Sequence, residues 1–165
     1  MAIVNSPVLD AGINSEELFD EERILVVPID HTLASVESID IATLADYKVM
    51  LTPVGTTFRD ALDQELASSG RQLQAAAEVD GLRLLAALAH QGYAPALLPA
   101  SAVSGYPEGE WSMVHVNGLK RRSVGLVSNR RTSPSMPVQA AREVLTDVIR
   151  KIAPRQPGIH VTLDR

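Results

Sequence analysis

The 165-residue sequence contains no cysteine. Within this chain, that absence excludes disulfide bonds, thiolate nucleophiles and cysteine-ligated zinc sites. Aromatic residues are also scarce, at 4% of the sequence. A hydrophobic core must therefore be built from Leu, Val, Ile and Ala, in a sequence that is 45% hydrophobic.

Long hydrophobic runs are missing as well, since no apolar stretch approaches the roughly 20 residues that cross a bilayer. The first residues carry neither the basic segment nor the long apolar segment that opens a secretory signal. We therefore expect a soluble, cytoplasmic protein that does not bind membranes.

Basic residues are fewer than acidic ones, with 15 Lys and Arg against 20 Asp and Glu, and the net charge is −5. That balance does not suit a chain that holds nucleic acid by neutralising phosphates. Charged runs at residues 20–22, 120–122 and 130–131 predict solvated turns.

Motifs for catalysis and cofactor binding are absent too. The sequence has no phosphate-binding glycine loop followed by Lys, no Gly-x-Gly-x-x-Gly and no Gly-x-Ser-x-Gly. Its four histidines lack the spacing of metal ligands, so we predict no metal, no cofactor and no enzyme activity. These histidines are His31, His90, His115 and His160.

Apolar stretches alternate with amphipathic helical stretches along the chain. Strands are predicted at residues 2–4, 23–27, 47–51, 73–79, 94–98, 111–116 and 123–128, and helices at residues 41–45, 58–66, 81–91 and 134–152. This alternation predicts an α/β fold with a mostly parallel sheet and crossover helices. In such sheets, ligands collect outside the carboxyl ends of the strands.

The predicted ends of these helices follow from capping chemistry. Asp80 is placed to cap the helix at residues 81–91, and Ser133 to cap the last helix, with Pro134 in its first turn. The last helix has a predicted inward stripe of Val138, Ala141, Leu145, Val148, Ile149 and Ile152. From residue 154 onward we expect a frayed tail.

The most informative stretch is residues 51–60, which predicts a strand end, a tight loop and the first turn of a helix. Pro53 and Gly55 break the strand, and Thr56 or Thr57 offers a hydroxyl where an N-cap belongs. Thr57 with Asp60 fits a capping box in its Asp-containing form. Free N–H groups at such a helix start can hold an anion or a carbonyl.

The order of several short motifs resembles the effector-binding domain of LysR-type transcriptional regulators. These motifs are residues 24–28 (Ile-Leu-Val-Val-Pro) with Asp30, His31, Leu33 and Ala34; residues 44–46 (Leu-Ala-Asp); residues 53–56 (Pro-Val-Gly-Thr); residues 78–80 (Glu-Val-Asp); and the leucine-rich residues 85–99. The resemblance covers about residues 2–150. Two positions depart from the family pattern: Thr32 stands where the family usually has Pro, and residues 93–95 replace a second Gly.

The resemblance implies a two-lobe domain like that of periplasmic binding proteins. It places residues 1–27 in a remnant of the first lobe and a crossing strand, residues 28–110 in an essentially complete second lobe, and residues 111–153 in a return to the first lobe, followed by a tail at residues 154–165. The start of the first lobe and the DNA-binding domain are expected to lie outside this sequence.

The resemblance also implies a function. A small effector, often carrying a carboxylate, would bind between the lobes, and this chain would meet DNA only through a separate domain. The second lobe's contribution would come from Thr52, Pro53, Gly55, Thr56 and Thr57. A homo-oligomer is the expected state of the regulator.

Two alternatives stay open at this point. One is a solute-binding protein of the same two-lobe architecture, against which the missing export signal counts. The other is a small α/β enzyme of unrecognised type that uses His31 or His115.

Overall fold

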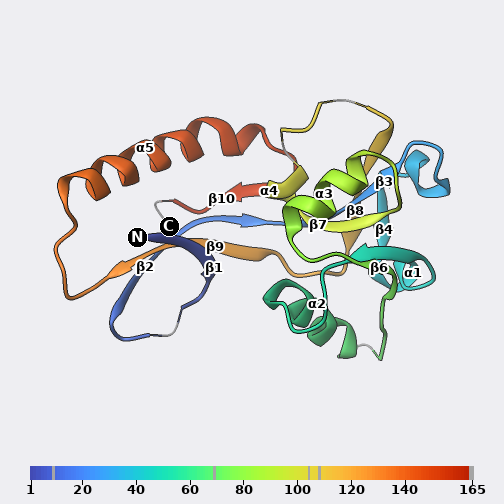
Figure 1. Ribbon diagram of the computed structural model, residues 1–165, viewed down its shortest axis with the longest axis horizontal. Coiled ribbons are helices and arrows are strands. Elements are labelled where there is room, and N and C mark those ends of the chain that lie inside the picture. The colour runs from blue at the N-terminus through green and yellow to red at the C-terminus, as the bar shows by residue number, and fades with distance from the viewer. Residues whose placement is uncertain (9, 69, 104, 108, 164–165) are drawn as a thin grey trace. The chain divides into compact units, whose positions relative to one another are not determined.

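The computed structural model describes residues 1–8, 10–68, 70–103, 105–107 and 109–163. Backbone contacts divide the chain into two compact units (Figure 1). Unit 1 comprises Met1–Glu21 and Arg121–Arg165, and unit 2 comprises Glu22–Lys120. The chain therefore passes between the units twice, between residues 21 and 22 and between residues 120 and 121. The lobe boundaries implied by the family resemblance stay a prediction.

Unit 2 is built on a six-stranded sheet with the order β4-β8-β3-β7-β5-β6. Its strands are β3 (Arg23–Pro28), β4 (Ser38–Asp40), β5 (Lys48–Leu51), β6 (Gln74–Glu78), β7 (Ala96–Pro99) and β8 (Trp111–Asn117). Its helical segments are η1 (Thr32–Ser35), α1 (Ile41–Leu44), α2 (Thr57–Ala67), α3 (Leu82–His90) and α4 (Ala100–Val103).

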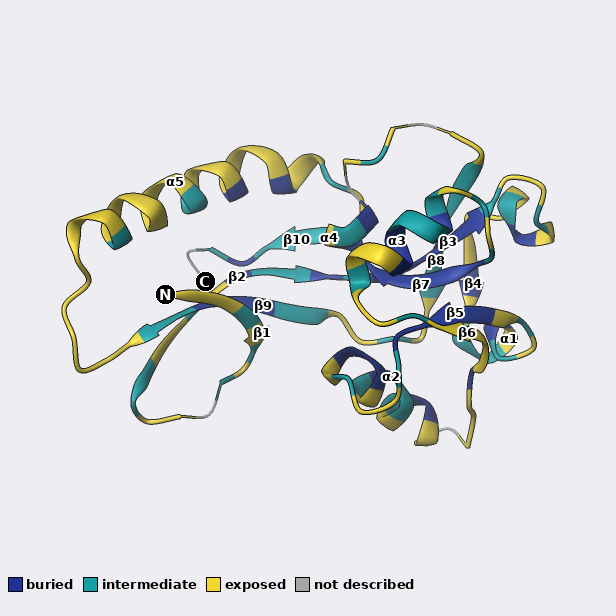
Figure 2. Ribbon diagram, viewed as in Figure 1, coloured by how far each residue is buried: buried dark blue, intermediate teal, exposed yellow. Residues whose placement is uncertain are grey.

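This sheet is mixed, which corrects the expectation of a mostly parallel one. The β4–β8, β5–β6 and β5–β7 pairs are parallel, but β3 pairs antiparallel with both β7 and β8. The apolar run in β3 is buried on both faces, as is typical of a strand inside a covered sheet (Figure 2). A continuous apolar run reports burial and carries no information about the direction of the neighbouring strands.

The core of unit 2 lies around the central strands and α2. Its buried members include Leu25, Val27, Leu51, Leu62 and Leu97. The helix α2 buries Phe58, Arg59, Leu62 and Leu66, and Ala61 is partly buried. Packing of this face fixes α2 onto the sheet and thereby holds the loop that precedes it.

Unit 1 contains a four-stranded antiparallel sheet with the order β1-β9-β2-β10. Its elements are β1 (Ala2–Ser6), β2 (Ile13–Glu21), β9 (Arg122–Asn129), α5 (Met136–Ile152), η2 (Ala153–Arg155) and β10 (Ile159–Val161). A small core formed by Leu18, Leu126, Ile149 and Ala153 joins α5 and η2 to this sheet.

Three sequence-based expectations for unit 1 were wrong. The acidic residues 20–22 do not form a solvated turn, because Asp20 and Glu21 belong to β2 and Glu21 is fully buried. Arg122 likewise lies in β9 and pairs with Glu21, so it is not a free turn residue. The chain after residue 154 does not fray, since β10 pairs with β2; residues 164 and 165 of the predicted tail lie outside the described residues.

Helix starts also differ from their predicted positions. The N-cap of α3 is Gly81, and Asp80 lies one residue earlier. The helix α5 begins at Met136 after Ser135, so Ser133 is not its cap and Pro134 is not in its first turn. Most of the stripe predicted on α5 is exposed or half-buried, and Ile149 is its one buried residue (Figure 2).

Candidate ligand-binding loop

The loop at residues 52–56 connects β5 to α2 and contains the predicted helix cap. Thr56 is the N-cap residue, in extended conformation, and its Oγ1 accepts a hydrogen bond from the Arg59 N–H at 3.4 Å. The prediction that one of two threonines caps this helix is thus confirmed for Thr56. The capping box of Thr57 and Asp60 is wrong, because the Asp60 carboxylate accepts a hydrogen bond from the Gly55 N–H at 2.9 Å.

Two threonine hydroxyls meet inside this loop. Oγ1 of Thr56 lies 2.9 Å from Oγ1 of Thr52 and 2.8 Å from the Pro53 carbonyl oxygen. Each hydroxyl has one proton to donate, so these short distances leave the two side chains little rotational freedom. Gly55 has φ +88, a left-handed conformation that a residue with a Cβ rarely adopts. Together these features give the loop one defined shape.

A buried arginine donates a hydrogen bond to the backbone of this loop. The Arg59 side chain is only 5% exposed, and its Nη1 donates to the Thr52 carbonyl oxygen at 3.2 Å. The same Nη1 lies 3.1 Å from Glu78 at the end of β6, while Nε donates to Asp63 at 2.8 Å. The charge of Arg59 is therefore balanced by the carboxylates of Asp63 and Glu78, and its Nη1 also donates to the loop backbone.

The five predicted site residues differ in how they could meet a ligand. Gly55 and Thr57 are exposed, Pro53 and Thr56 are half-buried, and Thr52 is buried. Thr52 could therefore act only through Thr56. No described residue accepts a hydrogen bond from the Thr57 N–H, which begins the helix.

One residue that the sequence analysis did not single out completes this loop, namely Arg59. Arg59 interrupts the apolar face of α2 between Phe58 and Leu62, and a buried charge at such a position signals a partner in the fold. Which distant groups become its partners, the Thr52 carbonyl and the Glu78 carboxylate, depends on tertiary structure.

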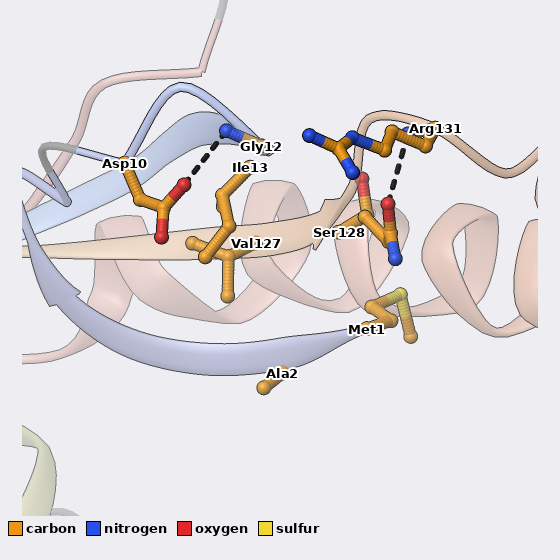
Figure 3. A pocket seen from close by; sticks show the side chains of 9 residues that line it. Met1, Ala2, Asp10, Gly12, Ile13, Val127, Ser128 and Arg131 are labelled. Carbon is orange, nitrogen blue, oxygen red and sulfur yellow. Dashed lines mark hydrogen bonds between the residues drawn. The ribbon is translucent and has the colours of Figure 1, made fainter.

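Two hollows lie on the surface of unit 1. One of about 500 Å³ is lined by unit 1 residues that include Asp10, Gly12, Ser128 and Arg131 (Figure 3). A second, of about 800 Å³, lies between α5 and the strands of unit 1, where Arg142 pairs with Glu16 at 2.6 Å. The loop at residues 52–56 lines neither of these two hollows.

Two histidines of unit 2, His31 and His115, make structural hydrogen bonds. His31 is the N-cap of η1, and its Nδ1 accepts a hydrogen bond from the Leu33 N–H at 3.2 Å. His115 lies in β8, and its Nδ1 is 2.9 Å from the Glu22 carboxylate. Among the residues described, no group of three or more His, Asp or Glu could hold a metal ion.

The architecture defines an α/β protein made of two units, in which a loop after a parallel strand presents a helix N-terminus. A family model for the LysR substrate binding domain matches residues 1–150, so the chain belongs to this family of effector-binding domains from LysR-type regulators. The resemblance derived from the sequence motifs is thereby confirmed. None of the helices in the described ranges is both long and apolar enough to cross a membrane.

A curated relative supports this assignment. The chain is 36% identical over 95 residues to a probable hydrogen peroxide-inducible genes activator from Streptomyces viridosporus. This match covers 56% of the present chain and 30% of the relative, so the chain spans less than a third of that protein's length.

Solved structures show the same fold. The reduced OxyR regulatory domain from Pseudomonas aeruginosa has a TM-score of 0.68 at 26% identity, covering 90% of this chain and 71% of that one. The QuiR effector-binding domain in complex with shikimate gives 0.70 at 22% identity, with 91% and 71% covered. The regulatory domain of CcmR from Synechocystis PCC6803 in complex with 2-PG gives 0.72 at 19% identity, with 91% and 73% covered. The last two similarities concern the fold alone.

Proposed function

We propose that this chain senses a small, acid-bearing effector as the ligand-binding part of a LysR-type transcriptional regulator. The observation that carries the proposal is the loop at residues 52–56, which offers an exposed helix N-terminus in one defined shape. Its support comes from family membership and from two structural neighbours whose bound ligands are shikimate and 2-PG.

The loop would hold the ligand's polar end through hydrogen bonds. The Thr57 N–H donates from the first turn of α2, where the helix dipole also favours a partial negative charge. The Thr56 and Thr57 hydroxyls can donate or accept. Gly55, with no Cβ, lets the ligand approach the backbone closely. Arg59 and Thr52 keep the loop ready for binding and lower the ordering cost of association.

Effector binding would then change how a separate DNA-binding domain sits on its operator. This chain would contact DNA only through that domain, in keeping with its net charge of −5. We propose a cytoplasmic homo-oligomer, whose assembly is measured by light scattering.

Peroxide sensing by thiol oxidation is a separate function, suggested by the name of the Streptomyces relative. Sensing of that kind requires a reactive cysteine thiolate. The 165 residues contain no cysteine, so this chain cannot supply one. Reversible ligand binding is therefore the function that its residues support.

The test is isothermal calorimetry on the intact regulator with a panel of small hydroxy-carboxylates that includes shikimate. Thr56→Val removes the hydroxyl and is expected to weaken binding about tenfold, the loss that follows from one charge-assisted hydrogen bond. Thr56→Ser restores the hydroxyl and should recover most of the affinity.

Thr43→Val is the matched control, because Thr43 is exposed on α1 and lies outside the loop. Equal affinities in wild type and Thr56→Val would remove the loop from the binding site. Absence of any saturable ligand in the panel would count against an acid-bearing effector.

A further inference from the structure

Helix α2 is joined to both chain segments that connect the two units. Arg23 follows the first crossing, between residues 21 and 22, and Lys120 precedes the second, between residues 120 and 121. The Glu65 carboxylate on α2 contacts both of them. Its Oε1 accepts from Arg23 Nη1 at 2.9 Å, and its Oε2 accepts from the Lys120 backbone N–H at 3.1 Å.

The two connecting segments also contact each other at this point. Arg23 Nη1 lies 3.4 Å from the Lys120 carbonyl oxygen. Glu65 and Lys120 are 42 and 97 positions from Arg23 along the chain, so only the tertiary fold brings the three residues together. Glu65 therefore connects two distant parts of the chain, at Arg23 and at Lys120, to helix α2.

Arg23 reaches the start of α2 as well. Its guanidinium carbon lies 5.9 Å from the centre of the Phe58 ring, within the range of a cation–π contact. Phe58 and Glu65 are seven residues apart, which places them on the same helix face about 10 Å apart along the axis. Phe58 directly follows Thr56 and Thr57 of the candidate ligand loop. A short path thus runs from that loop through Phe58 and Arg23 to Glu65.

The ion pair between Arg23 and Glu65 is strongly constrained by burial. The side chain of Arg23 is 3% exposed and that of Glu65 is 21% exposed. Among the described residues, Glu65 is the one carboxylate within ion-pair distance of Arg23, and the buried Nε of Arg23 has no hydrogen-bond partner. Because a buried cation without its counter-charge is costly, Arg23 must follow Glu65 when α2 moves.

We infer that Glu65 and Arg23 are positioning residues that couple the ligand loop at the start of α2 to both segments connecting the units. The inference rests on the proposed function, because a bound effector can regulate only if it changes the structure beyond its own binding loop. The coupling itself is a property of the ligand-free chain and can be measured there.

The experiment is amide hydrogen exchange by NMR on the whole chain in five forms: wild type, Thr56→Val, Glu65→Ala, Glu65→Gln and the double variant with Thr56→Val and Glu65→Gln. The Lys120 N–H is the reporter, and the Leu25 N–H in the central strand β3 reports global opening. Glu65→Ala is expected to speed exchange at Lys120 about tenfold relative to Leu25, through the loss of one charge-assisted hydrogen bond.

The decisive quantity is the change that Thr56→Val causes in the exchange rate of the Lys120 N–H. In the wild-type background, loss of the cap should speed Lys120 exchange relative to Leu25. In the Glu65→Gln background, which keeps an acceptor for Lys120 but lacks the ion pair with Arg23, that effect should vanish. A purely structural role for Glu65 would leave the two effects equal and would overturn the inference. An absent effect of Thr56→Val in the wild-type background would also overturn it.

Gln64→Ala is the matched control, since Gln64 is the exposed neighbour of Glu65 on the same helix. It should leave both the Lys120 rate and the Thr56→Val effect unchanged. Glu65→Gln keeps an acceptor for Lys120 but loses the charge, so it should retain part of the protection. None of these measurements uses a ligand, so their failure is distinct from a failure of the calorimetric binding test.

Discussion

Nη2 of Arg122 lies 2.7 Å from Oε1 of Glu21, a carboxylate with no exposed surface. The pair joins β9 to β2, which lie side by side in unit 1 at the end nearest the connecting segments. A buried charge is tolerated only with its partner in place. The Arg122–Glu21 pair therefore fixes the register of these two strands.

Glu21→Ala should lower the free energy of unfolding by about 3–5 kcal/mol, because it leaves Arg122 without the carboxylate that its position demands. Urea denaturation followed by circular dichroism measures the change. Glu17→Ala is the control, since Glu17 is exposed on the same strand and should cost under about 0.5 kcal/mol. Similar losses for both variants would show that Glu21 acts only through strand propensity.

Thr56→Val should lower the free energy of unfolding by about 1 kcal/mol, the ordinary cost of removing an N-cap hydroxyl. Thr57→Val removes an exposed hydroxyl that is not the cap and should have a smaller effect. Thermal unfolding of the three proteins separates these values. A larger loss for Thr57→Val would assign the cap to Thr57.

We predict that the stability of the protein depends on pH through the ring of His90. Burial lowers the pKa of His90 below its ordinary 6.5, and the hydrogen bond to the Ala86 carbonyl, at 2.7 Å, opposes this only in part. The ring also stacks on Tyr106, with centroids 3.7 Å apart, and meets the edge of Trp111. The fold therefore favours the neutral imidazole.

A lowered folded-state pKa means that this contribution to stability is complete above pH 6.5 and is lost as the pH falls through the folded value. The melting temperature should thus drop on acidification from pH 7 to pH 5, and less so in His90→Gln. An NMR titration of the His90 ring in the native protein supplies the direct check. A midpoint at or above 6.5 would contradict the prediction.

Gly118→Ala should destabilise the protein by about 1–3 kcal/mol through backbone strain and overpacking. Gly118 has φ +88, and an added Cβ would lie 2.9 Å from Cγ2 of Ile41. Gly70→Ala is the control, because Gly70 has φ +66 but open space around its Cα. Chemical denaturation should show a smaller loss of unfolding free energy for Gly70→Ala than for Gly118→Ala. Equal losses would indicate that Ile41 moves away from the added Cβ at little energetic cost.

Much of unit 2 could be predicted from local patterns. The apolar run at residues 23–27, the two-residue period at residues 111–116 and the Pro53–Gly55 break each correspond to an observed element. These signals are local, because burial periodicity and turn chemistry act within a few residues. The five predicted ligand residues rest on the resemblance, and their role stays a prediction.

Strand direction and charge pairing could not be predicted in the same way. The β3 strand is flanked by antiparallel partners although its sequence suits a parallel sheet equally well. Glu21 looked like part of a solvated acidic run because Arg122, its partner, is 101 residues away. The cap of α3 shifted to Gly81 because helix ends depend on packing as well as on the best capping side chain.

By itself the sequence determined that thiol chemistry is unavailable, that strands and helices alternate, and that a threonine opens a helix after residue 55. It did so because composition and short-range stereochemistry are properties of the chain before it folds. Tertiary structure alone decided that Arg59 supports the Thr52 carbonyl and that Glu65 joins Arg23 to Lys120. Buried charges take whichever partners the packed fold brings within hydrogen-bond distance, and that choice is made across the whole chain.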